Sequence, residues 1–299
     1  MNQDNISPEN KSVGLRPNVI MFFFFVFIVI YPSFLYGWLY DQGTLHSLVL
    51  HAVYVVELMS IPVILYLVIS RKRPKNVLSI APITLKNAMY VAGITIAFVP
   101  ITWILIWGGM FLGDSLPVYI PSFNTMWLGI LTGGIIVAIF EELFFRGPVA
   151  YEYKRFGISI WKVALMSGVF FGALHGGVIQ ISYTAVWGFA MVLMLYYTRS
   201  IFAPILSHVI GNIFGHLLNP SYFVNSYMEL GDMFPNLLVI AGAATVVLLP
   251  IMVICWKKLI INNPQGKESP AKESKRFVYS YWAVIVIIVV MTVLREINT

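Results

Sequence analysis

Charged residues are scarce in this chain. Lys, Arg, Asp and Glu make up 11% of its 299 residues, whereas a soluble domain carries about 25%. Hydrophobic residues make up 59%, and the mean hydropathy is +0.82. Apolar runs of roughly 18 or more residues recur along the whole chain, and each is long enough to cross a bilayer. The composition therefore excludes an ordinary soluble protein and predicts an all-α polytopic membrane protein.

Cysteine is almost absent as well. Cys255 is the only one in the sequence, so an intrachain disulfide and a Cys-x-x-Cys metal site are both excluded. The sequence has no internal repeat and no low-complexity domain. A polar stretch at 262–275, with two prolines and a glycine, is typical of a flexible loop. We therefore expect a single integral-membrane domain that covers residues 1–299.

Nine apolar segments are predicted, which gives a bundle of about eight to nine transmembrane helices. The first segment is too long for the core of a signal peptide and has no obvious small-residue cleavage site, so we expect it to be retained. The approximate bounds are 18–39, 46–70, 88–112, 125–150, 160–178, 182–198, 202–219, 233–256 and 277–294.

Basic and acidic residues separate along this topology. If the N-terminus is cytoplasmic, the loops on the opposite side hold acidic residues and no Lys or Arg before Arg295. This is the positive-inside pattern. The net charge of +6 then reflects orientation and contact with anionic lipid, and the absence of a single basic face argues against a nucleic-acid partner. The acidic residues are Asp41, Asp114, Glu229 and Asp232.

The fourth segment carries three ionisable residues, Glu141, Glu142 and Arg146. An ionisable side chain at mid-bilayer costs about 2.5 to 3.5 kcal/mol on insertion scales, and such residues usually line a functional cavity. Glu142 and Arg146 have the spacing and order of a favourable helical ion pair. Glu141 points about 100° away from Glu142. We therefore predict a structural clamp between Glu142 and Arg146, and an unpaired, reactive Glu141.

Two further segments carry polar side chains four residues apart. Phe171 and His175 share a face of the fifth segment, and His208 and Asn212 share a face of the seventh. A lone histidine in an apolar helix is more often a core residue than a base. Glu141 and His175, however, each lie fourteen residues from a cytoplasmic helix end, which is about 21 Å along a straight helix. This similar depth favours a shared site.

Small residues support close packing of the same segments. Glycines at GxxxG spacing let helix backbones approach closely in a membrane. They are Gly129 and Gly133, then Gly168, Gly172 and Gly176, then Gly211 and Gly215. Outside these segments, His51 is interpreted as an interfacial residue. Glu57 is interpreted as a paired structural acid, with a functional role as the alternative.

In order and spacing, these motifs resemble the signature of the CAAX-protease and bacteriocin-processing family, also called the Abi family. It comprises intramembrane endopeptidases and includes the eukaryotic Ras-converting enzyme. The resemblance covers about residues 125–218. The motifs that carry it are Glu141-Glu142-x-x-x-Arg146, Phe171-x-x-x-His175 and His208-x-x-x-Asn212.

The resemblance implies a role for each of these residues. Glu141 would activate water together with His175, His208 and Asn212 would stabilise the oxyanion, and Glu142 with Arg146 would form the structural clamp. The substrate would be a peptide or a membrane protein. Compact loops favour a bacterial member, located in the cell membrane with its N-terminus in the cytoplasm.

Three alternatives compete with this hypothesis. Members of the family are often labelled metallopeptidases, and Glu141, His175 and His208 would suffice to bind a catalytic zinc. We favour a reaction without a cofactor because HExxH is absent and Asn212 is a poor zinc ligand. A proton-coupled transporter would also use intramembrane charges, but the repeats or paired broken helices typical of transporters are not found. A non-catalytic immunity or scaffolding protein is the third alternative.

Overall fold

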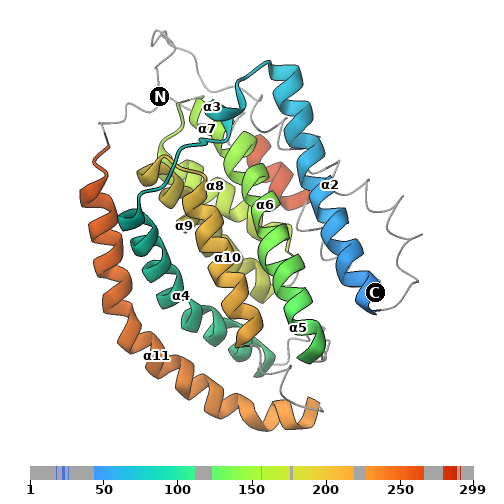
Figure 1. Ribbon diagram of the computed structural model, residues 1–299, viewed down its shortest axis with the longest axis vertical. Helices are drawn as coiled ribbons and strands as arrows, with labels where there is room; N and C mark the ends of the chain where they lie inside the picture. Colours follow the sequence, from blue (N-terminus) through green and yellow to red (C-terminus); the bar gives the residue numbers. More distant parts are fainter. Residues whose placement is uncertain are drawn as a thin grey trace.

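The structure, a computed structural model, describes residues 18, 22, 23, 26, 44–111, 123–155, 157–175, 178–218, 227–265, 279–287 and 290. Within this described part, every regular element is a helix, and the helices form one bundle (Figure 1). The predicted all-helical membrane fold is thus confirmed. The predicted first segment, 18–39, lies almost wholly outside the described residues.

The helices follow the predicted apolar segments closely, apart from their ends. A further helical stretch covers residues 279–287. The labelled elements are α2 (Thr44–Ser70), α3 (Pro74–Val77), α4 (Leu85–Phe111), α5 (Phe123–Gly129), η1 (Ile130–Val137), α6 (Ala138–Phe144), η2 (Phe145–Val149), α7 (Ala150–Arg155), α8 (Ile160–Ala173), α9 (Val178–Thr198), α10 (Phe202–Leu217) and α11 (Tyr227–Asn262).

Five helices in the described part are long and apolar enough to cross a membrane. They cover 49–70, 85–107, 126–155, 180–198 and 235–262. The helices α8 and α10 have 14 and 16 residues, which gives lengths of about 21 and 24 Å, short of a hydrocarbon core of about 30 Å. Two of the three predicted motifs therefore lie on or beside short helices packed among longer ones.

The fifth predicted segment, 160–178, was too long. The helix α8 ends at Ala173, and the backbone N–H of His175 bonds to the Gly172 carbonyl in the turn that follows. Two glycines come next in the sequence, and glycine is favoured where a helix ends. His175 therefore lies just beyond the helix and not on its face.

The chain from Phe123 to Arg155 is one long helix that combines α-helical and π-helical turns. It bends at Gly147, whose ψ angle is −112°. The following Pro148 has no N–H to continue the helical hydrogen bonds, which explains the bend. A Cβ at Gly147 would come within 2.6 Å of the Leu78 side chain. The depth of Glu141 calculated for a straight helix therefore does not apply.

Helices α8 and α9 pack with their backbones in close approach, as the glycine spacing predicts. A Cβ at Gly168 would lie 2.6 Å from the Ala185 carbonyl oxygen, and one at Gly172 would lie 2.8 Å from that of Ile181. Helix α10 packs against α4, α9, η1 and α6, whereas α2 covers another side of α6. Helix α11 lies along the outside of α4 (Figure 1).

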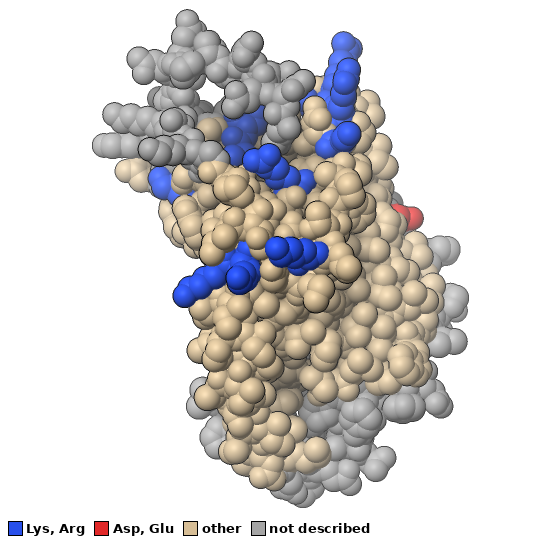
Figure 2. Space-filling view, turned by 60° about the vertical axis from the view of Figure 1, so that its left-hand side comes forward, with Lys and Arg blue, Asp and Glu red and all other residues tan. Residues whose placement is uncertain are grey.

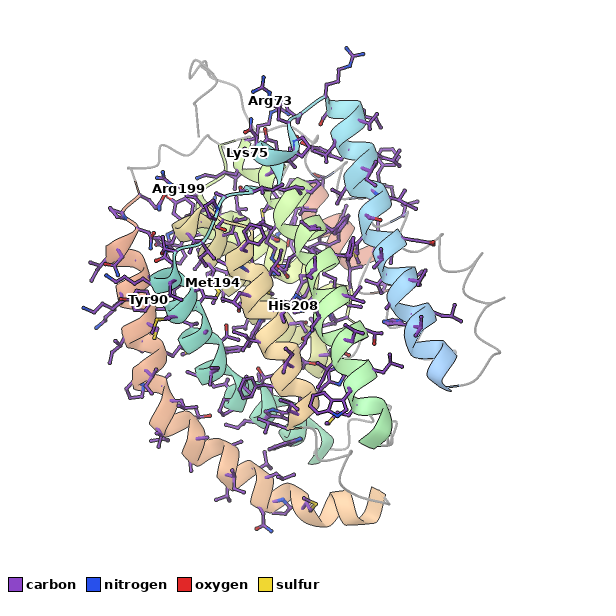
Figure 3. The ribbon with its side chains drawn as sticks, viewed as in Figure 1. Arg73, Lys75, Tyr90, Met194, Arg199 and His208 are labelled. Atoms are coloured by element: carbon purple, nitrogen blue, oxygen red, sulfur yellow. The ribbon has the colours of Figure 1, made fainter. Side chains whose placement is uncertain are left out.

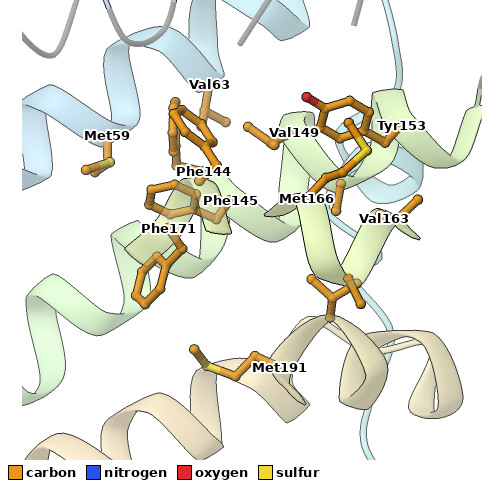
Figure 4. Close-up of a cluster of buried hydrophobic side chains, with 14 of the residues drawn as sticks. Met59, Val63, Phe144, Phe145, Val149, Tyr153, Val163, Met166, Phe171 and Met191 are labelled. Carbon is orange, nitrogen blue, oxygen red and sulfur yellow. The ribbon is translucent and has the colours of Figure 1, made fainter. Parts of the chain in front are cut away.

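The apolar core joins the end of α6 to α8 (Figure 4). Phe145 is its centre, with ring centroids 4.9 Å from Phe144, 5.6 Å from Phe170 and 4.9 Å from Phe171, all edge to face. All four side chains are almost completely buried. Because these rings fix α8 against α6, they also fix the relative positions of the polar residues on the two helices.

Lys and Arg gather toward one end of the bundle. Figure 2 shows them from the top down to about mid-height of the face that it displays and none below, and Figure 3 places Arg73, Lys75 and Arg199 near that end. Asp41 and Asp114 lie outside the described residues, and the side chains of Glu229 and Asp232 are not described. His208 lies near the middle of the bundle in Figure 3.

Candidate active site

A fully buried carboxylate, Glu142 on α6, contacts two basic side chains. Its Oε2 lies 3.0 Å from Nε of Arg146, and its Oε1 lies 2.8 Å from Nδ1 of His208 on α10. Glu142, Arg146 and His208 are 0%, 1% and 7% exposed. Burying a charge is costly unless it is paired. Here Oε2 forms the ion pair with Arg146, and Oε1 is hydrogen-bonded to His208. The spacing of the sequence predicts an ion pair between Glu142 and Arg146. It contains no indication that His208 is the second partner of Glu142.

Arg146 is also held by α8 and α9. Its Nη2 donates to the carbonyl oxygen of Gly188 at 3.3 Å. The guanidinium carbon lies 4.7 Å from the ring centroid of Phe171 and 5.7 Å from that of Phe145, within the range of cation–π attraction. Arg146 thereby connects three helices around one buried charge.

Glu141, the next residue along α6, is less enclosed than Glu142. Its side chain is 13% exposed, and its Oε2 lies 3.7 Å from Nε2 of His208. The imidazole of His208 thus faces Glu142 with one nitrogen and Glu141 with the other. The structure brings together Glu141 and His208, which the sequence predicts to share one cavity.

Two residues near this pair were not predicted as site residues. His51 on α2 is close enough to Glu141 for their charges to interact. Ser207, directly before His208, is hydrogen-bonded through Oγ to Oγ1 of Thr95 on α4 at 2.7 Å, and both are buried. No sequence spacing links either pair, because only the packing of α2 on α6 and of α4 on α10 creates the contacts.

His175 contacts the residue one turn before it. Its Nδ1 lies 2.7 Å from the Phe171 carbonyl oxygen. A carbonyl only accepts hydrogen bonds, so Nδ1 carries a proton, and Nε2 is the nitrogen that remains for another partner. The Phe171 ring lies 4.4 Å from the ring of His175 and 5.7 Å from that of His208. Among the described residues, Glu141 and His175 share no direct hydrogen bond, and the Phe171 ring contacts both histidine rings.

Asn212 lies one turn after His208 and faces the same long helix. Its Nδ2 donates to the carbonyl oxygen of Gly133 in η1 at 3.2 Å. The amide group has a second N–H, which this bond does not use. His216 follows after one more turn and lies against Gly133, with Nε2 3.5 Å from where a Cβ would stand. The face of α10 that carries His208, Asn212 and His216 therefore packs along η1 and α6.

The zinc alternative requires Glu141, His175 and His208 as ligands. Among the residues that the structure describes, no three His, Cys, Asp or Glu side chains lie in an arrangement that could hold a metal ion. Because Nδ1 of His208 is hydrogen-bonded to Glu142, only its Nε2 could bind a metal. The residues as arranged do not fit a three-ligand zinc site, and independence from metal stays a prediction.

All six predicted site residues lie within a segment that matches a known family. Residues 123–214 match the family model described as Rce1-like, type II CAAX prenyl endopeptidase Rce1-like. This part of the chain, which is less than a third of its length, is similar to the CAAX protease family. The match confirms the predicted family and nearly coincides with the predicted region 125–218. A search of curated proteins and a search of solved structures found no match.

The match to the CAAX protease family supports an intramembrane protease activity in general. It also agrees with the apolar helices, which make the chain an integral membrane protein. The match does not distinguish a glutamate protease from a metalloprotease. That distinction depends on the chemistry of Glu141 and its neighbours.

Proposed function

We propose that this protein is an intramembrane endopeptidase of the glutamate type, which hydrolyses a peptide bond in a membrane-associated peptide or protein. The observation that carries the proposal is the position of His208, with one nitrogen on each of two adjacent carboxylates. Only one of these carboxylates, Glu142, is fully buried and committed to a structural ion pair. The Glu141 carboxylate is therefore available to act as a general base.

In the proposed reaction, Glu141 takes a proton from water while the water oxygen bonds to the carbonyl carbon of the substrate. His175, with Nε2 as an acceptor, assists in orienting this water. The carbonyl oxygen becomes negatively charged as the C–O bond forms. When the C–N bond breaks, Glu141 returns its proton to the leaving amine, so the base becomes the acid of the second step.

The oxyanion requires donors that are already in place. If His208 is protonated, Nδ1 donates to Glu142 and Nε2 points to the side of Glu141, where it donates to the oxyanion. Asn212 supplies its second amide N–H from the next turn of α10. Preorganised donors of this kind are worth about 2.7 to 4 kcal/mol each in hydrolases. Arg146 and His208 then also balance the charges of Glu141 and Glu142.

The membrane orientation is part of the proposal. Because Lys and Arg gather at one end of the bundle, that end would face the cytoplasm. The environment would be the bacterial cell membrane.

The decisive experiment compares peptide termini across the proteome of cells that produce the wild-type protein or Glu141→Ala. We expect a set of new termini, in membrane-associated proteins, that the wild-type protein generates and the variant does not. Matched amounts of both proteins in the membrane are the control. Identical termini in the two cultures would contradict proteolysis and favour an immunity, scaffolding or transport role.

A further inference from the structure

A cavity lies at the ends of three helices, and neither Glu141 nor His208 lines it. Its volume is about 450 Å³, and it lies between the start of α8, the end of α9 and the end of α11. None of the proposed catalytic residues lines it. Its walls include Ser159, Trp161, Tyr196, Tyr197, Ile260 and Gln265.

The cavity lies where two candidate membrane spans end. The spans finish at Thr198 and Asn262, within a few residues of the lining residues on α9 and α11. Trp161 and the two tyrosines form an aromatic group at the same level. Tryptophan and tyrosine are enriched where a protein crosses from the hydrocarbon core to the polar headgroups. The cavity is therefore at headgroup level.

Cations stand at the rim of this cavity. Nζ of Lys154 lies 5.1 Å from the ring centroid of Tyr196, and Nη2 of Arg199 donates to Oε1 of Gln265 at 3.2 Å. The residues that line the cavity include no acidic side chain. Arg199 lies at the end of the bundle where basic residues gather (Figure 3). The rim is thus suited to a negatively charged group.

The walls, in contrast, are largely apolar. Ile160 and Ile260 line the cavity together with Trp161, which is 55% exposed. We propose that this cavity binds an anionic phospholipid, with its phosphate near Lys154 and Arg199 and an acyl chain along Trp161 and Ile260. Basic pockets between membrane helices on the cytoplasmic side recognise acidic lipid headgroups. The volume is within the range of small-molecule sites, about 300 to 1,000 Å³.

The test uses the full-length protein in detergent, with native mass spectrometry as the readout. Phosphatidylglycerol and phosphatidylcholine with identical acyl chains are added in parallel. We expect bound phosphatidylglycerol in clear excess. The double variant Lys154→Gln/Arg199→Asn should lower its affinity by about tenfold or more. Asparagine is chosen because φ at Arg199 is 56°, a conformation that asparagine tolerates.

Two further variants distinguish a specific lipid-binding site from non-specific electrostatic attraction. Lys72→Gln/Arg73→Asn removes the same charge from the connection between α2 and α3, and should leave lipid binding unchanged. Ile260→Trp fills the cavity without changing charge, and should also reduce binding. Equal binding of the two lipids, or equal loss in both double variants, would overturn the proposal. Full displacement of the lipid by millimolar inorganic phosphate would show an anion site without lipid recognition, and would overturn it too.

Discussion

Nδ1 of His208 lies 2.8 Å from Oε1 of Glu142, on the carboxylate that also pairs with Arg146. The clamp predicted within one helix is therefore a unit of three residues that also holds α10. This arrangement places the other nitrogen of His208 toward Glu141. A structural ion pair and a candidate catalytic pair thus share one imidazole ring.

The clamp should contribute to folding, and Glu141 should not. Removing one partner of a buried ion pair leaves an uncompensated charge and costs about 3 to 5 kcal/mol. We therefore expect Glu142→Ala and Arg146→Ala to express poorly and to unfold at lower temperature in detergent. Glu141→Ala, at the neighbouring position, is the control and should retain the wild-type unfolding temperature without activity. Equal stability of all three variants would contradict this assignment.

Phe171 should matter for activity through its contacts with both histidines. Its ring lies against His175, His208 and the guanidinium of Arg146, and leucine would fill most of the space without a flat aromatic face. We expect Phe171→Leu to lower turnover by roughly tenfold or more. We expect it to lower the free energy of unfolding by no more than about 3 kcal/mol.

The neighbouring Phe170 provides a matched control. It is also fully buried on α8, but its ring contact is with Phe145 and not with either histidine. Phe170→Leu should cost similar stability while the folded protein keeps its turnover. The measurement is turnover per folded molecule for both variants. The same loss of turnover in both would mean that Phe171 acts only by packing.

The GxxxG pattern can be tested by comparing two glycines. A Cβ at Gly168 would meet the backbone of Ala185 and Phe189 at 2.6 and 2.7 Å, and backbone cannot move aside as a flexible side chain can. Gly168→Ala should therefore destabilise the protein by about 1 to 3 kcal/mol or more. Gly215 has the same type of spacing, but apart from its own helix no atom of the described residues lies within 4 Å of its added Cβ. Gly215→Ala should be neutral or slightly stabilising, because alanine favours helix. Unfolding temperatures in detergent decide the comparison.

The different surroundings of these glycines show that the sequence predicted the helices but not the contacts between them. Apolar runs predicted the helices well, since helices that cross a bilayer must be long and apolar. The i,i+4 spacing also indicated the ion pair of Glu142 and Arg146, because both partners lie on one helix. Spacing along one helix does not show what faces it. The close contact of Gly168 and the open surroundings of Gly215 follow from the neighbouring helices.

The site shows the same division. His208 and Glu141 are 67 positions apart, and a family resemblance, not helical periodicity, connected them in the sequence. The electrostatic interaction of His51 with Glu141 and the hydrogen bond of Ser207 with Thr95 depend on how α2 and α4 pack, for which the sequence carries no pattern. The bend at Gly147 and the end of α8 at Ala173 were signalled by Pro148 and by the glycines after His175. The prediction treated both helices as straight and continuous.

Metal removal should leave the protein active. In the proposed reaction Glu141 is the base and Nε2 of His208 donates to the oxyanion, so neither group binds a metal during turnover. We expect elemental analysis of active purified protein to find zinc well below one atom per chain, and chelator treatment to leave turnover unchanged. Stoichiometric zinc whose loss and return track activity would refute the metal-free reaction. It would make Glu141, His175 and His208 ligands.

Asn212 should affect the chemical step more than the fold or substrate binding. Its amide donates one N–H to Gly133, and the proposal assigns the second to the oxyanion, which exists only after water has attacked. Removing such a donor lowers turnover by about 10²- to 10³-fold. We therefore expect Asn212→Ala to lower kcat by this factor while KM stays nearly unchanged.

Asn212→Asp keeps the size but removes both N–H donors, and should lose at least as much activity. If Asn212 only joined α10 to η1, both variants would unfold at lower temperature while their folded fraction kept a normal kcat. Measuring kcat, KM and the unfolding temperature on the same preparations separates the two roles.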